Sequence, residues 1–354
     1  MALITLRQLL DHAAEHGYGM PAFNITNLET LQAVMIAADR TGSPVLVQAS
    51  RSARSYVDDV FLKHMFQAAI ERYPHIPVCV HLDHGNELST CLSAMENGFS
   101  SVMMDGSLMA DAKTPSDFDY NVEVTASVVE QAHARGVSVE GEIGVLGSLE
   151  TGEGEKEDGH GFEGKLEKKQ LLTDPAEAEA FVRATGVDAL AVAVGTSHGA
   201  YKFSRRPDGD ILAMEVIEAI HARLPATHLV MHGASTVPQD LQDLINAHGG
   251  EIPGTFGVPL EEVERGIRHG VRKVNIDTDI RMAMTGSIRK FLDENRSSFD
   301  LRAILKPGRE RTIALCLERF ERFGAAGMAS RIRPSTLHAM ADRYAAGLFN
   351  TKVA

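Results

Sequence analysis

The chain has 354 residues, of which 44% are hydrophobic and 23% are charged, and its formal net charge is −13. This composition is ordinary for a soluble globular protein, and the negative charge argues against nucleic acid as the main partner. The N-terminal stretch turns polar too early for a signal peptide, and no apolar run approaches membrane-spanning length. Three widely spaced cysteines, Cys79, Cys91 and Cys316, fall in apolar patterns and indicate reduced core thiols in a cytoplasmic protein.

Strands alternate with helices along the chain. Runs rich in Val, Ala, Ile and Leu predict eight strands, at residues 19–24, 44–50, 77–83, 101–106, 137–144, 189–195, 228–234 and 271–278. The helical patterns between them, such as 27–42, 87–98 and 174–186, open near Asn, Asp or Thr and close on Gly, as capped helices do. Eight strands with helical crossovers predict a parallel (β/α)₈ barrel, the TIM barrel fold. A doubly wound open sheet is the competing architecture, but no G-x-G-x-x-G follows a strand.

Two segments fall outside this repeat. Residues 145–171 are rich in glycine and charge and lack an apolar period, which favours a long mobile lid. Residues 286–354 predict extra helices, at 287–296, 310–324 and 334–349, that pack on the side of the barrel or on a partner subunit. We therefore expect one domain over residues 1–354, with the barrel ending at about residue 285 and a C-terminal helical extension after it.

Every predicted strand ends in a polar side chain. In a barrel of this kind the C-terminal strand ends converge on one mouth, where the chemistry takes place. In chain order these residues are Asn24, Ser50, Asp83 with His84, Asp105, Glu142, His198, His232, and Asn275 with Asp277. Three histidines among carboxylates predict a metal site, and three imidazoles with an open position are typical of catalytic zinc. Asp105 and Glu142 could support these ligands or form an alternate or second metal position.

Phosphate signals follow the last strands. Strand seven ends in "HGAST" and strand eight in "NIDTD", and each leads into a helical pattern. Small residues let the backbone approach an anion, and N–H groups at a helix start attract it. Loops after strands seven and eight often hold phosphate in these barrels. Strand six ends in "GTSHGAYK", which adds Lys202 beside His198.

Five segments together resemble a known family. "HIPVCVHLDHG" and "VEGEIGVLGSLE" are similar to the two sequence motifs of class II, zinc-dependent fructose-1,6-bisphosphate aldolases. "GTSHGAYK", "HGAS" and "NIDTDIRMA" match further segments of that family in the same order. The resemblance runs from about residue 3 to about residue 330 and implies the barrel, a zinc ion and a sugar bisphosphate substrate.

The resemblance assigns roles to individual residues. It makes His84, His198 and His232 the zinc ligands, places Glu142 near the metal, and gives Asp83 the proton of the C4 hydroxyl. The residues it places around the ketose phosphate are Gly199, Gly233, Ser235, Asn275, Asp277 and Thr278. Carbonyls near Gly199 and Gly233 would offer a site for a monovalent cation, Na⁺ or K⁺. It also places Arg281 on the distal phosphate in the neighbouring subunit, which requires a homodimer or a higher homo-oligomer.

The sequence departs from shorter members of that family in two places. It has an acidic insertion after Leu149 and a longer C-terminal tail, features that resemble the form found in bacteria fixing carbon through the Calvin cycle. Activity on sedoheptulose 1,7-bisphosphate therefore becomes plausible. The insertion also leaves the mobile glutamate of the lid open, because ungapped matching gives Glu150 whereas "EKEDG" offers Glu157.

The chemistry of the residues fits the same reaction, the reversible cleavage of fructose 1,6-bisphosphate to dihydroxyacetone phosphate and glyceraldehyde 3-phosphate, a step of glycolysis, gluconeogenesis and the Calvin cycle. Breaking this bond leaves negative charge beside a carbonyl, and zinc would stabilise the enediolate as a Lewis acid. Asp83 beside His84 is placed to act as the base, and a glutamate on a closing lid would return the proton to carbon. A lysine Schiff base is the other solution, but Lys273 lies too deep in strand eight.

Other activities stay open at this stage. Tagatose-1,6-bisphosphate aldolase is the nearest alternative, because its substrate differs only in the configuration at C4. A zinc-dependent hydrolase on the same barrel would want H-x-H on strand one, and "PAFN" lacks it. A non-catalytic metal protein would want a closed fourth ligand, and no strand ends in cysteine. Instead of binding a phosphate, Arg281 could form an ion pair with Asp277 or Asp279.

Overall fold

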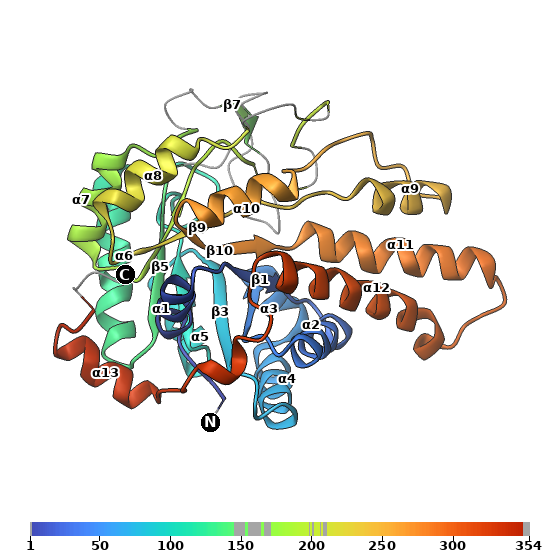
Figure 1. Ribbon diagram of the computed structural model, residues 1–354, viewed down its shortest axis with the longest axis horizontal. Helices are drawn as coiled ribbons and strands as arrows, with labels where there is room; N and C mark the ends of the chain where they lie inside the picture. Colours follow the sequence, from blue (N-terminus) through green and yellow to red (C-terminus); the bar gives the residue numbers. More distant parts are fainter. Residues whose placement is uncertain are drawn as a thin grey trace.

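The computed structural model describes residues 2–144, 153–154, 164–165, 171–197, 199, 202–205, 207 and 211–349. Parallel strands close into a barrel in the order β1-β10-β9-β8-β5-β4-β3-β2 (Figure 1). They are β1 (Met20–Asn24), β2 (Val45–Ser50), β3 (Val78–Gly85), β4 (Ser101–Met104), β5 (Ser138–Ile143), β8 (Ala189–Val192), β9 (His228–Met231) and β10 (Val271–Ile276). Each coincides with a predicted strand, so the (β/α)₈ barrel is confirmed. A separate two-stranded sheet pairs β6 (Glu153–Gly154) with β7 (Gly164–Lys165).

Helices surround the barrel and mostly follow the predicted crossovers. They are α1 (Leu6–His16), α2 (Leu28–Thr41), α3 (Arg51–Val57), α4 (Asp59–Arg72), α5 (Leu88–Glu96), α6 (Phe118–His133), α7 (Pro175–Thr185), α8 (Met214–Arg223), α9 (Gln239–Ala247) and α10 (Leu260–Arg268). The expected cap chemistry is present: Asn27 and Thr30 form a capping box at the start of α2, and Gly42 ends it in the left-handed region. Local signals thus set where α2 begins and ends.

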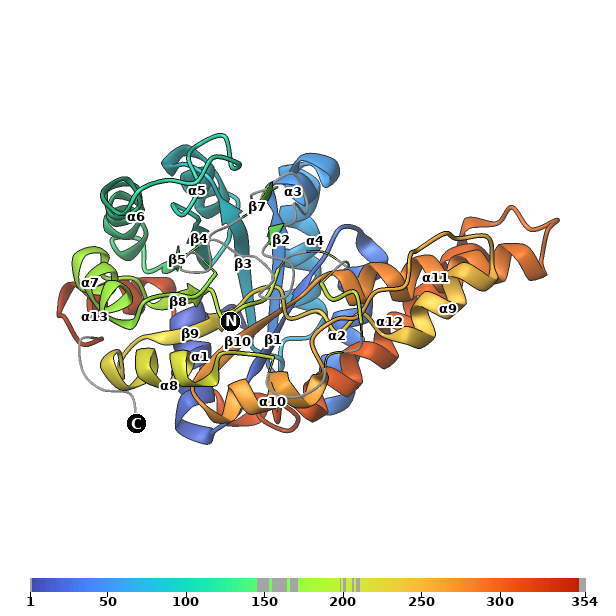
Figure 2. The same ribbon diagram turned by 90° about the horizontal axis from the view of Figure 1, so that it is seen from above.

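The C-terminal helices form two groups. Helices α11 (Thr278–Glu294) and α12 (Leu301–Arg322) pack on each other, α12 also packs on α2, and with α9 they project from the barrel as an arm (Figures 1 and 2). Helix α13 (Leu337–Ala345) packs instead on α6, where Tyr344 stacks on His133. Helices α12 and α13 thus each pack on a helix of the barrel, α2 and α6 respectively, while packing on a partner subunit stays a prediction. A short 3₁₀ helix (Ala329–Arg331) lies between α12 and α13.

The boundaries of the extension differ from expectation. Helix α11 runs unbroken from Thr278, so residue 285 falls inside it rather than at its start. Helix α12 begins at Leu301, before the expected position at 310, and contains Pro307. All three cysteines are buried and free of disulfides, as predicted. In the described part of the chain, no helix is both long and apolar enough to cross a membrane.

Candidate active site

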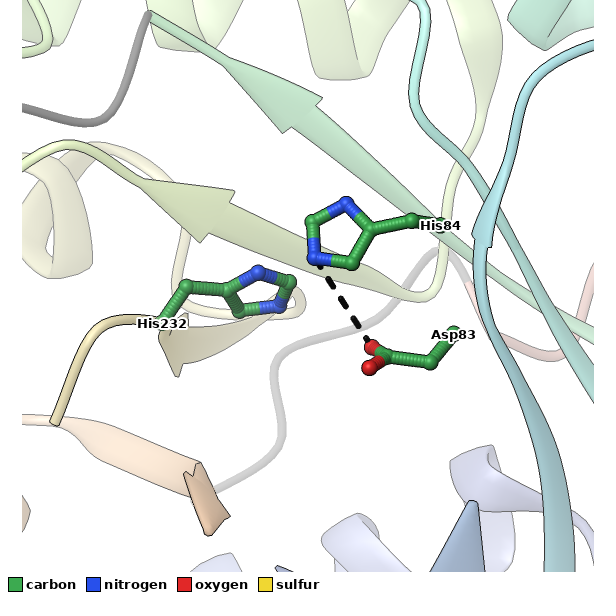
Figure 3. A group of neighbouring side chains, drawn as sticks. All are labelled: Asp83, His84 and His232. Atoms are coloured by element: carbon green, nitrogen blue, oxygen red, sulfur yellow. Dashed lines mark ion pairs between the residues drawn. The ribbon is translucent and has the colours of Figure 1, made fainter. Parts of the chain in front are cut away.

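The tip of β3 carries the first two residues of the site. Successive strand residues normally face opposite sides, yet Asp83 and His84 both reach one cluster (Figure 3). The pairing of β3 with β4 shifts register between Leu82 and Gly85, and His84 has a φ of 49°, in the left-handed region. A bulge of this kind re-aims a side chain, and backbone strain of this kind tends to occur at functional sites. The local backbone thus brings an acid and an imidazole together.

His232, directly after β9, completes this cluster. Its ring lies 4.8 Å from that of His84, centroid to centroid, at an interplanar angle of 77°. One ligand atom from each of Asp83, His84 and His232 lies within 4.8 Å of the others (Figure 3). His84, Asp105 and Glu142 form a second, overlapping set by the same measure. Five of the residues predicted at the mouth are therefore neighbours.

Carboxylates orient both imidazoles. His84 Nδ1 lies 2.8 Å from Asp105 Oδ2, and the Ser107 hydroxyl donates to Asp105 Oδ1 at 2.6 Å. His232 Nε2 lies 2.9 Å from Glu140 Oε1, while its Nδ1 is 3.5 Å from Glu142 Oε2. A carboxylate on one ring nitrogen fixes the ring and directs the other nitrogen, which is how metal-binding histidines are usually held.

Glu140 is a site residue that the sequence analysis missed. It lies fully buried two residues before Glu142, and its carboxylate pairs with Lys273 Nζ at 2.8 Å. His81 lies in the same layer, 3.4 Å from Glu140 Oε2, and its Nδ1 is 2.8 Å from Ser101 Oγ. The missed signal is the alternation "E-G-E", because glutamates two apart face the same side of a strand. Lys273 is as deep in the barrel as predicted.

The electrostatics of this cluster favour a bound cation. Burial, and then the negative charge of Asp105, raise the pKa of Glu142 well above its usual value. Glu142 Oε2 is buried and has no hydrogen-bond partner among the described residues. Burial lowers the pKa of His84, but Asp83 and Asp105 outweigh it and raise the pKa to about 9. Carboxylates are thus among the causes of both pKa shifts, and a donor set of imidazoles and carboxylates suits a cation such as zinc.

Asp83 is held as an oriented carboxylate. Asn24 Nδ2 donates to its Oδ2 at 2.9 Å, and Asn275 Nδ2 donates to its Oδ1 at 3.2 Å. Gln48, which the sequence analysis missed, donates in turn to Asn24 Oδ1 at 2.6 Å. Burial opposes ionisation of Asp83, but the charges of His84 and Lys273 outweigh it and hold its pKa well below the usual range. Asp83 is therefore an anion in a fixed position.

Other predicted residues lie around this centre. Ser50, paired in register with Asp83, caps α3 by accepting from Ala53 N at 3.2 Å. Lys202 is buried and donates to the carbonyl oxygen of Ser197. The predicted ligand His198 and both lid glutamates, Glu150 and Glu157, lie outside the described residues.

The glycines predicted near the phosphate have special backbone conformations. Gly199 and Gly233 have φ values of 76° and 62°, which favour glycine. A Cβ on Gly233 would also collide with the backbone of Ser197, so the loops after β8 and β9 touch there. Ser235 is buried in the β9 loop. Only glycine fits at Gly233, where two predicted phosphate loops meet.

Arg281 makes the ion pair that the sequence left open. Its Nε and Nη2 donate to the two carboxylate oxygens of Asp277, at 2.8 and 2.6 Å, and the side chain is 39% exposed. Thr278, the first residue of α11, is buried. Asp279 does not take part, because its carboxylate accepts from the β9 loop instead.

Comparison with known proteins identifies the family of the chain. Residues 4–328 match the family of class II fructose-bisphosphate aldolases. The chain belongs to this family. It is 63% identical to fructose-bisphosphate aldolase 2 of Cereibacter sphaeroides over the whole of both chains, and 62% identical to fructose-bisphosphate aldolase of Rhizobium meliloti over 98% of this chain and 97% of that one.

Solved structures show the same fold for this class II aldolase. The YdjI aldolase from Escherichia coli K12 is 26% identical, with a TM-score of 0.68, over 92% of this chain and 99% of that one. A putative fructose-1,6-bisphosphate aldolase from Coccidioides immitis has the same identity and TM-score over 91% of this chain and 97% of that one. These likenesses agree with the barrel fold of the chain.

Proposed function

We propose that this chain catalyses the reversible cleavage of fructose 1,6-bisphosphate into dihydroxyacetone phosphate and glyceraldehyde 3-phosphate. The observation that carries the proposal is the anionic Asp83, held by two amides and adjacent to the His84 and His232 imidazoles. A relative named fructose-bisphosphate aldolase 2 matches the chain over its full length at 63% identity. An aldol cleavage without a Schiff base requires a general base beside a bound metal ion. The side chains of Asp83, His84, His232, Asp105 and Glu142, called the metal cluster below, could supply the two.

The metal would be one catalytic zinc ion per subunit. His84 and His232 would bind it together with His198, and Glu142 and Asp105 would support it or form an alternate position. Glu142 Oε2, buried without a hydrogen-bond partner among the described residues, supports a cation at this place. When bound, zinc would supply a Lewis acid that polarises the ketone of the substrate.

Residues of the chain would move the protons. In cleavage, the Asp83 carboxylate takes the proton of the C4 hydroxyl, the C3–C4 bond breaks, and its electron pair stays with the ketose fragment. Glu150, or alternatively Glu157, would then deliver a proton to that carbon. In the condensation direction each group reverses its role. Asn24 and Asn275 keep Asp83 aimed at the hydroxyl, because each binds one of its oxygens.

The ketose phosphate would lie between the loops after β8, β9 and β10. Gly199, Gly233, Ser235, Asn275, Asp277 and Thr278 would surround it, with Lys202 nearby, and Ser50 would meet the other end of the substrate. Carbonyl oxygens near Gly199 and Gly233 would hold Na⁺ or K⁺. The contact between these loops at Gly233 supports a shared site.

The active protein would be a cytoplasmic homodimer or a higher homo-oligomer. Buried free cysteines support a reducing compartment. An exposed arginine on α11, at the base of the projecting arm, supports a contribution to a neighbouring subunit. Neither nucleic acid nor a membrane enters this proposal.

Metal removal tests the mechanism. EDTA should abolish cleavage, and zinc or cobalt should restore it, because the metal would supply the Lewis acid. A Schiff base is not expected, since Lys202 donates to the Ser197 carbonyl and Lys273 pairs with Glu140 deep in the barrel. Borohydride in the presence of substrate should leave activity unchanged, and covalent trapping of a substrate adduct would overturn the proposal. Single-turnover cleavage of fructose, tagatose and sedoheptulose bisphosphates would set the substrate preference.

A further inference from the structure

The loop after β9, residues 232–238, is strained at its end. Val237 has a φ of 46°, in the left-handed region that β-branched residues strongly avoid. Such a conformation persists only where the surroundings impose it. The loop also carries Gly233 and Ser235, which the proposed function places beside the ketose phosphate. Its shape therefore bears directly on how the backbone would meet that phosphate.

Asp279 holds this loop from the first turn of α11. Its carboxylate accepts hydrogen bonds from Thr236 N at 3.1 Å, Val237 N at 2.9 Å and the Thr236 hydroxyl at 2.9 Å. The side chain of Asp279 is 1% exposed. Two amides of the β9 loop, just before the N-cap of α9, thus donate to an internal anion, which leaves an incoming phosphate the amides from Gly233 to Ser235.

Arg319 reaches the same point from the C-terminal extension. Its Nη2 donates to Asp279 Oδ2 at 3.2 Å and to the Thr236 hydroxyl at 2.9 Å, and the side chain is 3% exposed. Its Nη1 donates to Glu318 at 2.8 Å. Arg319 lies on α12, outside the barrel repeat, so a helix of the arm directly contacts the β9 loop through the Thr236 hydroxyl.

We propose that Arg319 and Asp279 are positioning residues for the ketose phosphate, an inference that rests on the function proposed above. Asp279 fixes the β9 loop in its strained form and so aims the amides before Thr236. Arg319 anchors Asp279 and offsets its buried negative charge, which would otherwise repel a phosphate dianion at the same loop. The helical extension thereby contributes to substrate binding without touching substrate.

The decisive measurement compares binding with turnover. Arg319→Met should raise the Kd for dihydroxyacetone phosphate and the KM for fructose 1,6-bisphosphate by ~10-fold or more, the scale of a lost charge-assisted contact. The kcat should stay within about threefold and the zinc content should stay stoichiometric, because neither residue touches the metal cluster. Arg319→Lys should recover part of the loss, since it restores the charge but not the planar fork.

Two further variants separate charge from shape. Adding Asp279→Asn to Arg319→Met should bind dihydroxyacetone phosphate more tightly than Arg319→Met alone, because the uncompensated carboxylate is gone. Arg322→Met is the matched control: the same helix loses an exposed arginine that pairs with Glu261 and Glu264, and Kd and KM should not change. If Arg319→Met fails to fold, Asp279→Asn alone should still raise Kd and KM.

Ser235→Ala distinguishes failure of this inference from failure of the proposed function. If Ser235→Ala weakens dihydroxyacetone phosphate binding while Arg319→Met leaves it within about twofold, the phosphate site stands and the positioning role is wrong. If neither change affects binding, the phosphate does not lie in the β9 loop. That result would overturn both the positioning role and the phosphate site proposed above. A fall in kcat or zinc content at unchanged KM would also overturn the positioning role.

Discussion

At the scale of single residues, the site depends on how charges are paired. Asp83 has two amide donors and a neighbouring imidazole, so it stays ionised although it is buried. Glu142, on β5, has no such donors for its Oε2 among the described residues. Two carboxylates in one cluster of side chains thus receive different environments, which separates a proton-accepting group from one suited to a cation.

Asp83→Ala tests that separation. The variant should lose cleavage activity by at least ~100-fold, the usual size of a general-base effect, and should keep stoichiometric zinc. His84→Ala, by contrast, should lose the metal itself. Steady-state kinetics together with metal analysis of both variants would decide the matter. Because Asp83 lies within the metal cluster, loss of zinc from Asp83→Ala would identify it as a ligand instead of a base.

Lys273→Met tests the layer beneath the metal cluster. It breaks a fully buried pair with Glu140, so the free energy of unfolding of the metal-free protein should fall by about 3–5 kcal/mol. Adding Glu140→Gln should recover part of that loss, because it removes the buried carboxylate left without a cation. Urea unfolding would measure both. A loss no larger than that of Lys290→Met, which breaks an exposed pair with Glu294, would contradict a strong buried pair.

Some residues of the site could be predicted from the sequence and others could not. Asp83, His84 and His232 could be placed at one mouth because strand ends in a barrel converge. Glu140 and Gln48 could be recognised as polar residues within buried strands, but their partners could not, since the stagger of strands around the barrel decides which side chains meet. The bulge at His84 and the left-handed Val237 follow from tertiary packing and leave no local signal.

At the scale of elements, local signals predicted the barrel well and the extension less well. Strand periodicity and cap residues are short-range, and they gave the eight barrel strands and the ends of α2 and α7. The pair Pro307–Gly308 reads as a break, yet both residues lie within α12. A Cβ on Gly308 would lie 3.0 Å from Met284 Sδ on α11, so the glycine permits close packing that overrides the weak local propensity.

The predicted lid, between β5 and α7, contains two candidate proton donors, Glu150 and Glu157. Glu150→Gln should slow exchange of the C1 proton of dihydroxyacetone phosphate far more than Glu157→Gln does, because Glu150 follows β5 at a shorter chain distance and needs less travel. Each variant serves as the control for the other, since both remove one acidic group from the same segment. Proton exchange measured by NMR would show the order, and the reverse order would assign the role to Glu157.

At the scale of the whole molecule, the arm links the active site to a distant surface. Helix α11 begins at the barrel mouth and runs outward with α12 and α9 (Figure 2). Phe299, between α11 and α12, and Leu301, the first residue of α12, expose 91% and 69% of their surface. Large apolar side chains exposed together on a projecting element favour contact with another chain. This supports the proposed oligomer and a role for α11 across it.

Arg281 gives the test of that role. In one subunit its guanidinium forms a bidentate pair with Asp277, but 39% of the side chain is exposed and the helix start disfavours a cation. If it binds the distal phosphate in the neighbouring subunit, Arg281→Ala should cost ~2–3 kcal/mol in kcat/KM for the bisphosphate. Binding of dihydroxyacetone phosphate, which lacks that phosphate, should barely change.

Mixed oligomers would show whether Arg281 serves the site of its own subunit or that of the neighbouring subunit. A site formed across the interface needs Asp83 from one subunit and Arg281 from the other. Co-assembly of Arg281→Ala with Asp83→Ala subunits should therefore restore activity, because some hybrid sites combine both intact residues. Arg322→Met mixed with Asp83→Ala is the control, since its own sites are already intact and mixing should add nothing. Demonstrably mixed oligomers without recovery would place Arg281 in the site of its own subunit, and an unchanged kcat/KM in Arg281→Ala would leave it only its ion pair with Asp277.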